Sequence, residues 1–190
     1  EVIQQLRSLG AVGEEKNLKI LYLALTSRIL DQPISLALKG TSSGGKSKIL
    51  KTVINLFPES AYYLISSMSD KALYYSDECF IHRFLIIYEN AGVDSDFVSY
   101  VIRSLLSEGR VRHITVEKTD SGMQIRELDK EGPTGFITTT TAISLHPENE
   151  TRLLSLAIAD DPDQTKKILM RIADSAMGEI TLPAVPESFL

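Results

Sequence analysis

The sequence contains little cysteine and no long apolar segment. Cys79 is the single cysteine in 190 residues, so an internal disulfide is excluded. A chain of this kind suits the reducing cytoplasm, where we expect the protein to reside. No apolar run reaches the length of a membrane span, and the first residues do not form a secretory signal peptide. We therefore expect no membrane partner.

The sequence also lacks an excess of positive charge and any metal-binding pattern. Its net charge of −5 argues against a wholly basic nucleic-acid surface, although oligomeric motors can confine basic groups to a pore. His82, His113 and His146 are scattered without the spacing of metal ligands, and Cys79 has no motif that would stabilise a thiolate. We assign none of these four residues a catalytic role.

The composition is otherwise that of a globular domain. Hydrophobic residues make up 43% and charged residues 24%, and 190 residues suffice for one domain with a real core. The chain begins at Glu1 rather than Met and ends on a proline-containing tail. We therefore expect it to be one domain of a longer protein.

The most informative stretch is a glycine-rich loop at residues 40–47. It satisfies the pattern G-x-x-x-x-G-K-[ST] of a nucleotide-binding P-loop at every fixed position. The loop consists of Gly40, Thr41, Ser42, Ser43, Gly44, Gly45, Lys46 and Ser47. A short apolar strand is predicted before it at 34–39, and a helix after it at 47–54. A chance match by a Gly/Ser-rich loop would not account for these flanking elements.

The residue types of this loop suit a bound phosphate. The glycines let successive backbone N–H groups turn toward an anion, and the helix N-terminus adds a partial positive charge. Lys46 can reach the β- and γ-phosphates, and the Ser47 hydroxyl can bind Mg²⁺. The sequence therefore predicts ATP and Mg²⁺ as cofactors.

The remaining patterns predict an α/β fold, a three-layer sandwich with a mainly parallel five-stranded sheet. Apolar residues at helical spacing indicate helices at 14–30 and 96–107, and a continuous apolar run at 84–88 suits a strand buried on both faces. Alternating residues at 111–118 and 123–128 around a turn indicate a β-hairpin. Further predicted elements are helices at 1–12, 70–75 and 163–176 and strands at 61–66, 135–141 and 153–158.

These elements divide the chain into three segments. We expect an N-terminal helical segment at 1–30 that leads into the core. The core itself spans 31–160 and includes the hairpin at about 111–128. A C-terminal helix and tail occupy 161–190. There is no internal repeat and no low-complexity tract.

Polar residues after two predicted strands can complete a hydrolytic site. Glu89 follows the buried strand, so its carboxylate would lie beside the γ-phosphate as a base and as a contributor to the Mg²⁺ site. The alternative is a surface carboxylate that begins a loop. Thr139 and Thr140 end the next strand, where nucleotide motors often place a polar residue between the γ-phosphate and the attacking water. The alternative for the threonines is ordinary β-branched strand filling.

Arg152 precedes the last predicted strand. An arginine in this place commonly projects to a neighbouring subunit's nucleotide as an arginine finger. The alternative is a surface arginine paired with Glu148 or Glu150.

The order of these motifs resembles the AAA+ ATPase core, and the inserted hairpin resembles the pre-sensor-1 hairpin of the MCM and superfamily 3 helicases. Five segments are similar to ATPase domains fused to primases in phages and mobile elements. They are residues 39–47, 68–75, 102–109, 132–135 and 150–152, within a resemblance that covers roughly 12–172. The resemblance implies a ring-forming ATPase of the AAA+ type that moves along DNA, fused to or associated with a primase.

The resemblance also implies that the hairpin tip contacts DNA, which we expect to be single-stranded. Lys118 is the first candidate for this contact, and Arg112 and Arg126 are weaker ones. Two features depart from the family. Tyr88 stands where an Asp usually precedes the Glu, and the C-terminal lid is reduced to residues 163–176.

Two other classes of function remain open from the sequence. A P-loop phosphotransferase of the small-molecule kinase type would want an Arg-rich lid and an acceptor pocket, and it does not explain the hairpin. A nucleotide-switched binding module without turnover is compatible with Tyr88. The leading interpretation is the ATP-driven motor domain of a replicative DNA helicase or translocase.

Overall fold

The computed structural model describes residues 2, 4, 6, 13–42, 44–66, 73, 76–90, 95–119, 122–143, 145, 147–158 and 162–176. Its α-helices are α2 (Glu15–Thr26), α3 (Lys46–Ile54), α5 (Asp96–Glu108), α6 (Pro147–Glu150) and α7 (Pro162–Ala176). Its strands are β1 (Leu36–Lys39), β2 (Tyr62–Ile65), β3 (Arg83–Ile87), β4 (Arg110–Thr119), β5 (Gly122–Glu131), β6 (Thr134–Thr140) and β7 (Leu154–Ala157). Most of the helices expected at 1–12 and 70–75 lies outside the described residues.

The central sheet confirms the predicted mainly parallel five-stranded arrangement. Its order is β2-β3-β6-β1-β7, and every neighbouring pair is parallel. Strands that run in one direction bring their carboxyl ends to the same edge. Lys39 at the end of β1 is therefore opposite Thr140 at the end of β6, and Ile87 at the end of β3 is opposite Thr138.

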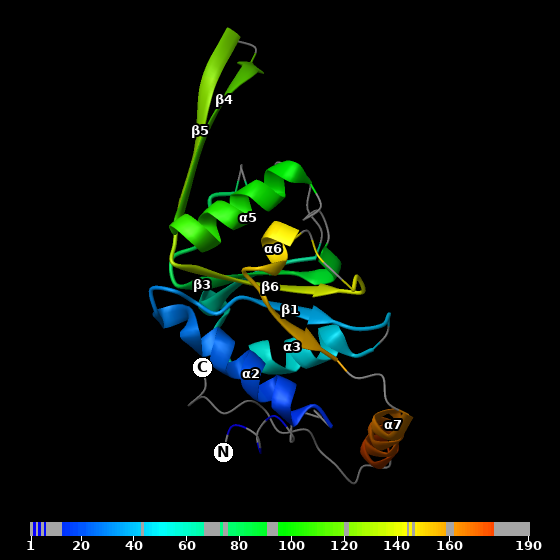
Figure 1. Ribbon diagram of the computed structural model, residues 1–190. Helices are drawn as coiled ribbons and strands as arrows, with labels where there is room; N and C mark the ends of the chain where they lie inside the picture. Colours follow the sequence, from blue (N-terminus) through cyan, green and yellow to red (C-terminus); the bar gives the residue numbers. More distant parts are fainter. Residues whose placement is uncertain are drawn as a thin grey trace.

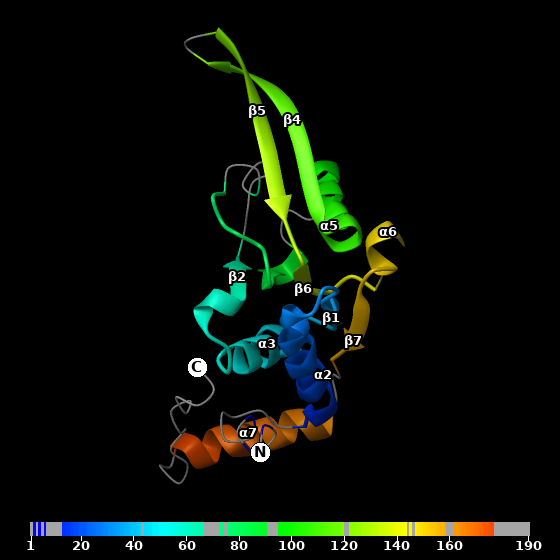
Figure 2. The ribbon, with the colours of Figure 1, turned by 90° about the vertical axis from the view of Figure 1, so that its left-hand side faces the viewer.

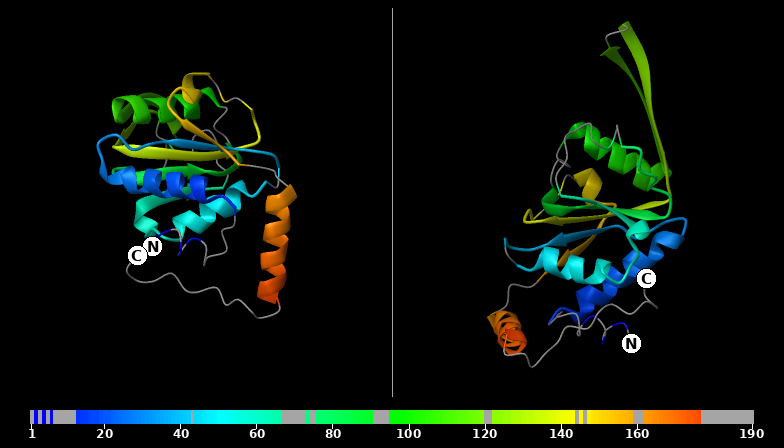
Figure 3. Two further views of the ribbon diagram at one scale, coloured as in Figure 1. Left: turned by 60° about the horizontal axis from the view of Figure 1, so that its bottom comes forward. Right: turned by 180° about the vertical axis from the view of Figure 1, so that it is seen from behind.

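Helices cover both faces of this sheet and make three layers (Figures 1 and 3). On one face, α2 and α3 enclose a core that includes Leu21, Leu25 and Leu50. On the other face, α5 buries Val98, Val101, Ile102 and Leu105, which recur at helical spacing. The predicted periodicity of α5 is thus confirmed, and β3 is buried on both faces, as its continuous apolar run predicted.

The β4–β5 hairpin extends away from the body of the domain (Figure 2). Its antiparallel ladder runs from Arg110 opposite Glu131 to Thr119 opposite Gly122, so it is longer than the expected 111–128. Ion pairs from Arg110 to Asp129 and to Glu131 stabilise the additional rungs near its base. Val111 is buried there, which anchors the ribbon on the α5 face of the domain.

The end of β3 and the placement of α7 could not be read from the sequence. The apolar run at 84–88 is a strand only as far as Ile87, because Tyr88–Asn90 forms the 3₁₀ turn η3. Helix α7 forms near the expected 163–176 but stands apart from the sheet (Figure 3). In the described part of the chain, no helix combines the length and apolar character needed to cross a bilayer.

Candidate nucleotide-binding site

The P-loop connects the end of β1 to the start of α3. Gly45 precedes α3 with φ 81° and ψ 3°, a left-handed conformation that side chains disfavour. The Gly44 N–H donates to the Thr41 carbonyl over 3.1 Å and closes the turn. A Cβ at Gly40 would lie 3.1 Å from the Ile158 carbonyl oxygen, so this glycine allows the chain just after β7 to pass close by. Ser43 lies outside the described residues.

Lys46 begins α3 and is 7% exposed. Its Nζ donates to the Gly40 carbonyl over 2.9 Å and to the Thr41 carbonyl. The ammonium group is therefore held within the curl of the loop, where the helix N-terminus adds positive potential. This is the electrostatic environment that a phosphate group requires.

A cavity of about 590 Å³ opens in front of the loop, within the range of small-molecule sites. It joins the P-loop to residues that follow β3 and end β6. Its lining residues are Ser42, Gly44, Gly45, Lys46, Ser47, Lys48, Glu89, Thr140 and Thr141. Most of the predicted nucleotide contacts, with Glu89 and Thr140, therefore line one polar cavity.

Glu89 lies in the turn η3 and lines this cavity. Its backbone has φ 55° and ψ 23°, a left-handed conformation that costs a non-glycine residue about 1–2 kcal/mol. The Glu89 N–H donates to the Thr139 Oγ1 over 2.9 Å. This hydrogen bond stabilises the turn that directs Glu89 to the cavity.

The two threonines proposed for one role occupy different places. Thr139 is fully buried, is absent from the cavity lining, and accepts the Glu89 N–H. Thr140 lines the cavity, and its Oγ1 accepts the Ala142 N–H over 3.0 Å. Successive strand residues point to opposite faces, which is why the two side chains separate. Thr140 therefore lines the cavity, whereas the Thr139 hydroxyl holds the backbone of Glu89.

Tyr88 does not replace the expected carboxylate. Its half-buried ring packs against the core on the α2–α3 face, and it is absent from the cavity lining. Burial, and to a lesser extent the neighbouring Tyr62, raises the pKa of the Tyr88 phenol above its ordinary value. The phenol therefore stays neutral at physiological pH and supplies no charge to a cation.

Arg152 follows α6 and precedes β7. Because β7 runs parallel to β1, it begins at the amino ends of the strands, whereas the P-loop lies at their carboxyl ends. Its Nε donates to the Ser107 Oγ at the end of α5, and its Nη1 donates to the Glu148 carbonyl. The side chain is absent from the lining of its own domain's cavity. The surface alternative, a pairing with the Glu148 or Glu150 carboxylate, is not among the described contacts of Arg152, which are with the Glu148 backbone, Ser107 and Thr151.

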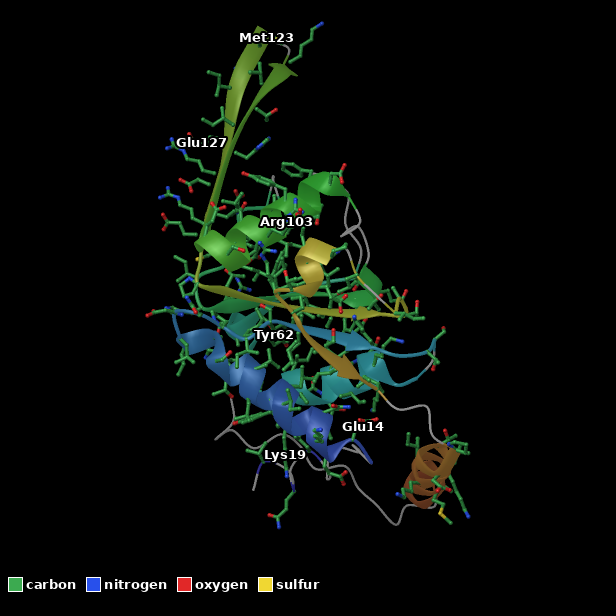
Figure 4. All side chains as sticks on the ribbon, viewed as in Figure 1. Glu14, Lys19, Tyr62, Arg103, Met123 and Glu127 are labelled. Atoms are coloured by element: carbon green, nitrogen blue, oxygen red, sulfur yellow. The ribbon has the colours of Figure 1, made fainter. Side chains whose placement is uncertain are left out.

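The three hairpin candidates for DNA contact differ in their surroundings. Arg112 forms an ion pair with Glu127, which partly compensates its charge. Lys118 is exposed opposite Met123, near the far end of the hairpin (Figure 4). The Arg126 side chain lies outside the described part of the structure.

The hairpin as a whole is not basic. Residues 110–131 hold five basic and five acidic residues. The outer half of the face that carries Lys118 is instead mostly apolar. That patch consists of Ile114, Val116, Met123 and Ile125, each more than half exposed.

Sequence reasoning missed two cavity residues, Lys48 and Thr141. Each follows a residue that was predicted, so their positions next to Ser47 and Thr140 were the available signal. It also missed an ion pair between Lys39 and Glu150. No local pattern marks that pair, because the partners are 111 residues apart.

The fold and this cavity together define a P-loop NTPase domain that binds a nucleotide. A fold comparison agrees. The structure of NtrX from Brucella abortus in complex with ATP superposes with a TM-score of 0.53 at 11% identity, over 90% of this chain and 41% of that one.

The family that matches is the MTBMA_p00010 P-loop domain, over residues 10–189, and the chain belongs to it. A curated relative is the protein MTBMA_p00010 of Methanothermobacter marburgensis, 27% identical over 176 residues. The match covers 87% of this chain but only 21% of that protein, so the chain spans about a fifth of its length. Uridine kinases of Streptococcus equi, subspecies zooepidemicus and equi, are 25% identical over 148 residues, covering 76% of this chain and 69% of theirs.

Proposed function

We propose that this domain binds and hydrolyses ATP as the motor of a replicative DNA helicase or translocase of the AAA+ type. The observation that carries the proposal is the convergence of Lys46, Ser47, Glu89 and Thr140 on one cavity. These are the groups that phosphate binding, cation binding and water activation require, and they come from three separate elements.

The oxygen donors of the cavity fit Mg²⁺. The described residues contain no cluster of three or more His, Cys, Asp or Glu that could hold a metal alone. Mg²⁺ in nucleotide sites takes few protein ligands and completes its shell with phosphate oxygens and water. Ser47 and Glu89 both line the cavity and would hold the ion there. When bound, it neutralises charge on the β- and γ-phosphates.

Side chains of the protein bind the phosphates, activate the water and stabilise the developing charge. Lys46 binds the β- and γ-phosphates, because its ammonium group is already held in the loop that cradles them. Glu89 accepts a proton from the attacking water or orients that water, and Thr140 hydrogen-bonds near the same position. Arg152 stabilises charge on the nucleotide of a neighbouring subunit, since it does not line its own cavity.

The first experiment measures ATP turnover of the domain with and without single-stranded DNA, alongside Glu89→Gln. The amide keeps the shape of the side chain but loses its basic oxygen, so this variant should bind ATP and hydrolyse it at least 100-fold more slowly. Turnover by the wild type that DNA stimulates supports the motor. A wild type that binds ATP without turnover would indicate a nucleotide-switched module instead.

The ring is tested by mixing variants of the full-length protein at concentrations where it assembles. Arg152→Ala and Glu89→Gln should each be nearly inactive, yet mixtures should recover activity. Some mixed interfaces pair an intact Glu89 with an intact Arg152 from the neighbour, which neither variant alone contains. Mixtures no more active than the sum of the two variants would mean that Arg152 either works within its own subunit or does not touch the nucleotide.

DNA contact at the hairpin is tested with two matched charge removals. Lys118→Ala should lower the slope of log K against log salt by about one, as expected for one lost phosphate contact. Arg112→Ala should change the slope less, because Glu127 already compensates part of that charge. Equal slopes for the wild type and Lys118→Ala would mean that the hairpin tip does not contact DNA.

A second candidate function is phosphoryl transfer to a small molecule, favoured by the similarity to uridine kinases. It predicts that ATP consumption depends on an acceptor nucleoside rather than on DNA. Measuring ADP release with uridine alone, with single-stranded DNA alone and with neither distinguishes the two candidates in one assay.

A further inference from the structure

A partly buried ion pair between Lys39 and Glu150, here called the clasp, connects the P-loop strand to the helix that precedes Arg152. Lys39 is the last residue of β1, directly before the P-loop. Its Nζ forms an ion pair with the Glu150 carboxylate of α6 and donates to the Ile143 carbonyl over 3.1 Å. The Lys39 side chain is only 15% exposed, so this pair is shielded from water more than the hairpin ion pairs are.

Glu150 is the centre of the clasp. Its Oε2 accepts the Leu145 N–H over 2.7 Å, and its Oε1 accepts the Ser155 hydroxyl over 3.0 Å. The hydrogen bond from Lys39, followed by that from the Leu145 backbone, lowers the pKa of the Glu150 carboxyl to about 2. The carboxylate is therefore charged throughout the pH range in which the protein would work.

The clasp lies between the cavity wall and Arg152. Thr140 and Thr141 line the cavity, and the loop that follows them supplies the Ile143 carbonyl and the Leu145 N–H. On its other side, Glu150 ends α6, whose Glu148 carbonyl accepts a hydrogen bond from Arg152. The Glu150 carboxylate thus contacts the loop that leaves the nucleotide pocket, while Glu150 itself belongs to the segment that holds Arg152.

The contacts between α6 and α5 are separate from the clasp. Arg103 forms an ion pair with Glu148, and the Asn149 amide donates to the Ser99 hydroxyl over 2.9 Å. The Arg152 contact with Ser107 adds a third link on that side. Removal of the Glu150 charge should therefore leave α6 packed on α5 and interrupt only its connection to the pocket.

We propose that Glu150, held by Lys39, is a positioning residue that couples the nucleotide pocket of one subunit to the Arg152 that the same subunit presents to its neighbour. When Thr140 and Thr141 contact phosphate, they favour one conformation of the loop that follows them. Glu150 contacts that loop and so transmits the change to the segment that holds Arg152. The inference rests on the proposed ring ATPase and adds a connection between successive sites.

The test uses Glu150→Gln in the full-length assembled protein, with Arg103→Gln as the matched control. Glu150→Gln keeps a hydrogen-bond acceptor but removes the charge. We expect it to lower ATP turnover about tenfold and leave nucleotide affinity within about twofold. Arg103→Gln removes an ion pair of α6 on the side away from the pocket and should leave turnover within about twofold.

Mixing separates this role from a merely structural one. Subunits with Glu150→Gln retain Glu89, so adding Glu89→Gln subunits should restore turnover at interfaces where the latter supply a well-placed Arg152. Lys39→Gln should behave like Glu150→Gln, and it replaces that variant if Glu150→Gln does not fold. The Arg152→Ala and Glu89→Gln mixture serves as the positive control.

The possible failures are distinguishable. If the positive control mixture shows no recovery, Arg152 does not act on a neighbour's nucleotide, and the proposed ring arrangement fails rather than the coupling through Glu150. If the positive control recovers, the coupling is refuted by Glu150→Gln turnover within about twofold of the wild type. It is equally refuted by a loss of turnover that Glu89→Gln subunits do not rescue, because Glu150 would then act on its own pocket.

Discussion

The buried Thr139 hydroxyl should control turnover without touching the nucleotide. Thr139→Val keeps the shape of the side chain but removes the oxygen that accepts the Glu89 N–H over 2.9 Å. Such a hydrogen bond contributes about 1 kcal/mol, while the left-handed backbone of Glu89 costs about 1–2 kcal/mol. Without the bond, the turn should favour a relaxed conformation that moves the Glu89 carboxylate away from the cavity.

The expected loss follows from these energies. Loss of about 1 kcal/mol lowers the ratio of the competent to the relaxed turn roughly fivefold. Single-turnover ATP hydrolysis should fall by that factor, and nucleotide affinity should be unchanged because Thr139 does not line the cavity. Thr139→Ser, which retains the oxygen, should stay close to the wild type.

Thr138→Val is the matched control for the loss of a buried, hydrogen-bonded hydroxyl. Thr138 is equally buried, but its hydroxyl donates to the Ile87 carbonyl rather than holding the Glu89 turn. Both valine variants should lower the free energy of unfolding by a comparable amount. If turnover falls equally in both, or if Thr139→Val hydrolyses ATP like the wild type, Thr139 does not position Glu89.

Further predictions concern the loop, the core and pH. Lys46→Ala should abolish turnover, because the β- and γ-phosphates lose their main counter-charge; a wild-type rate would refute the P-loop assignment. Gly45→Ala should lower the free energy of unfolding by only about 1 kcal/mol, since its cost is the positive φ and its surroundings are open. Gly135→Ala should cost about 1–3 kcal/mol or more, because the new Cβ would lie 2.3 Å from the buried Phe84 ring; chemical denaturation compares the two. The depressed pKa of Glu150 means that its stabilisation is present above an unfolded-state pKa near 4.3 and is lost as pH falls toward 2, so Glu150→Gln should flatten acid unfolding between those values.

The P-loop and the sheet could be predicted from the sequence because their signals are local. The fixed positions of residues 40–47 lie within eight residues, and a strand and a helix flank them as predicted. The apolar run before Glu89 and the helical spacing in α5 likewise report burial over a few neighbouring residues. These patterns sufficed for a parallel α/β fold with an inserted hairpin.

The roles of chemically similar residues could not be separated in this way. Three successive threonines of β6 have the same side chain, so only the strand register and the face to which each points decide their partners. Thr138 donates to the Ile87 carbonyl, Thr139 accepts the Glu89 N–H, and Thr140 lines the cavity. Arg112 was a weaker candidate for DNA contact than Lys118, but only the hairpin register placed Glu127 within reach of it.

The sequence by itself determined the class of ligand, because binding a phosphate needs glycines, a lysine and a hydroxyl within one short loop. Only the tertiary structure decided which distant groups meet that loop. Glu89 and Thr139 are 50 residues apart, and Lys39 and Glu150 are 111 apart. The first pair forms where β3 and β6 end together, and the second joins the end of β1 to α6. Both depend on strand order and register across the whole sheet rather than on any neighbouring residue.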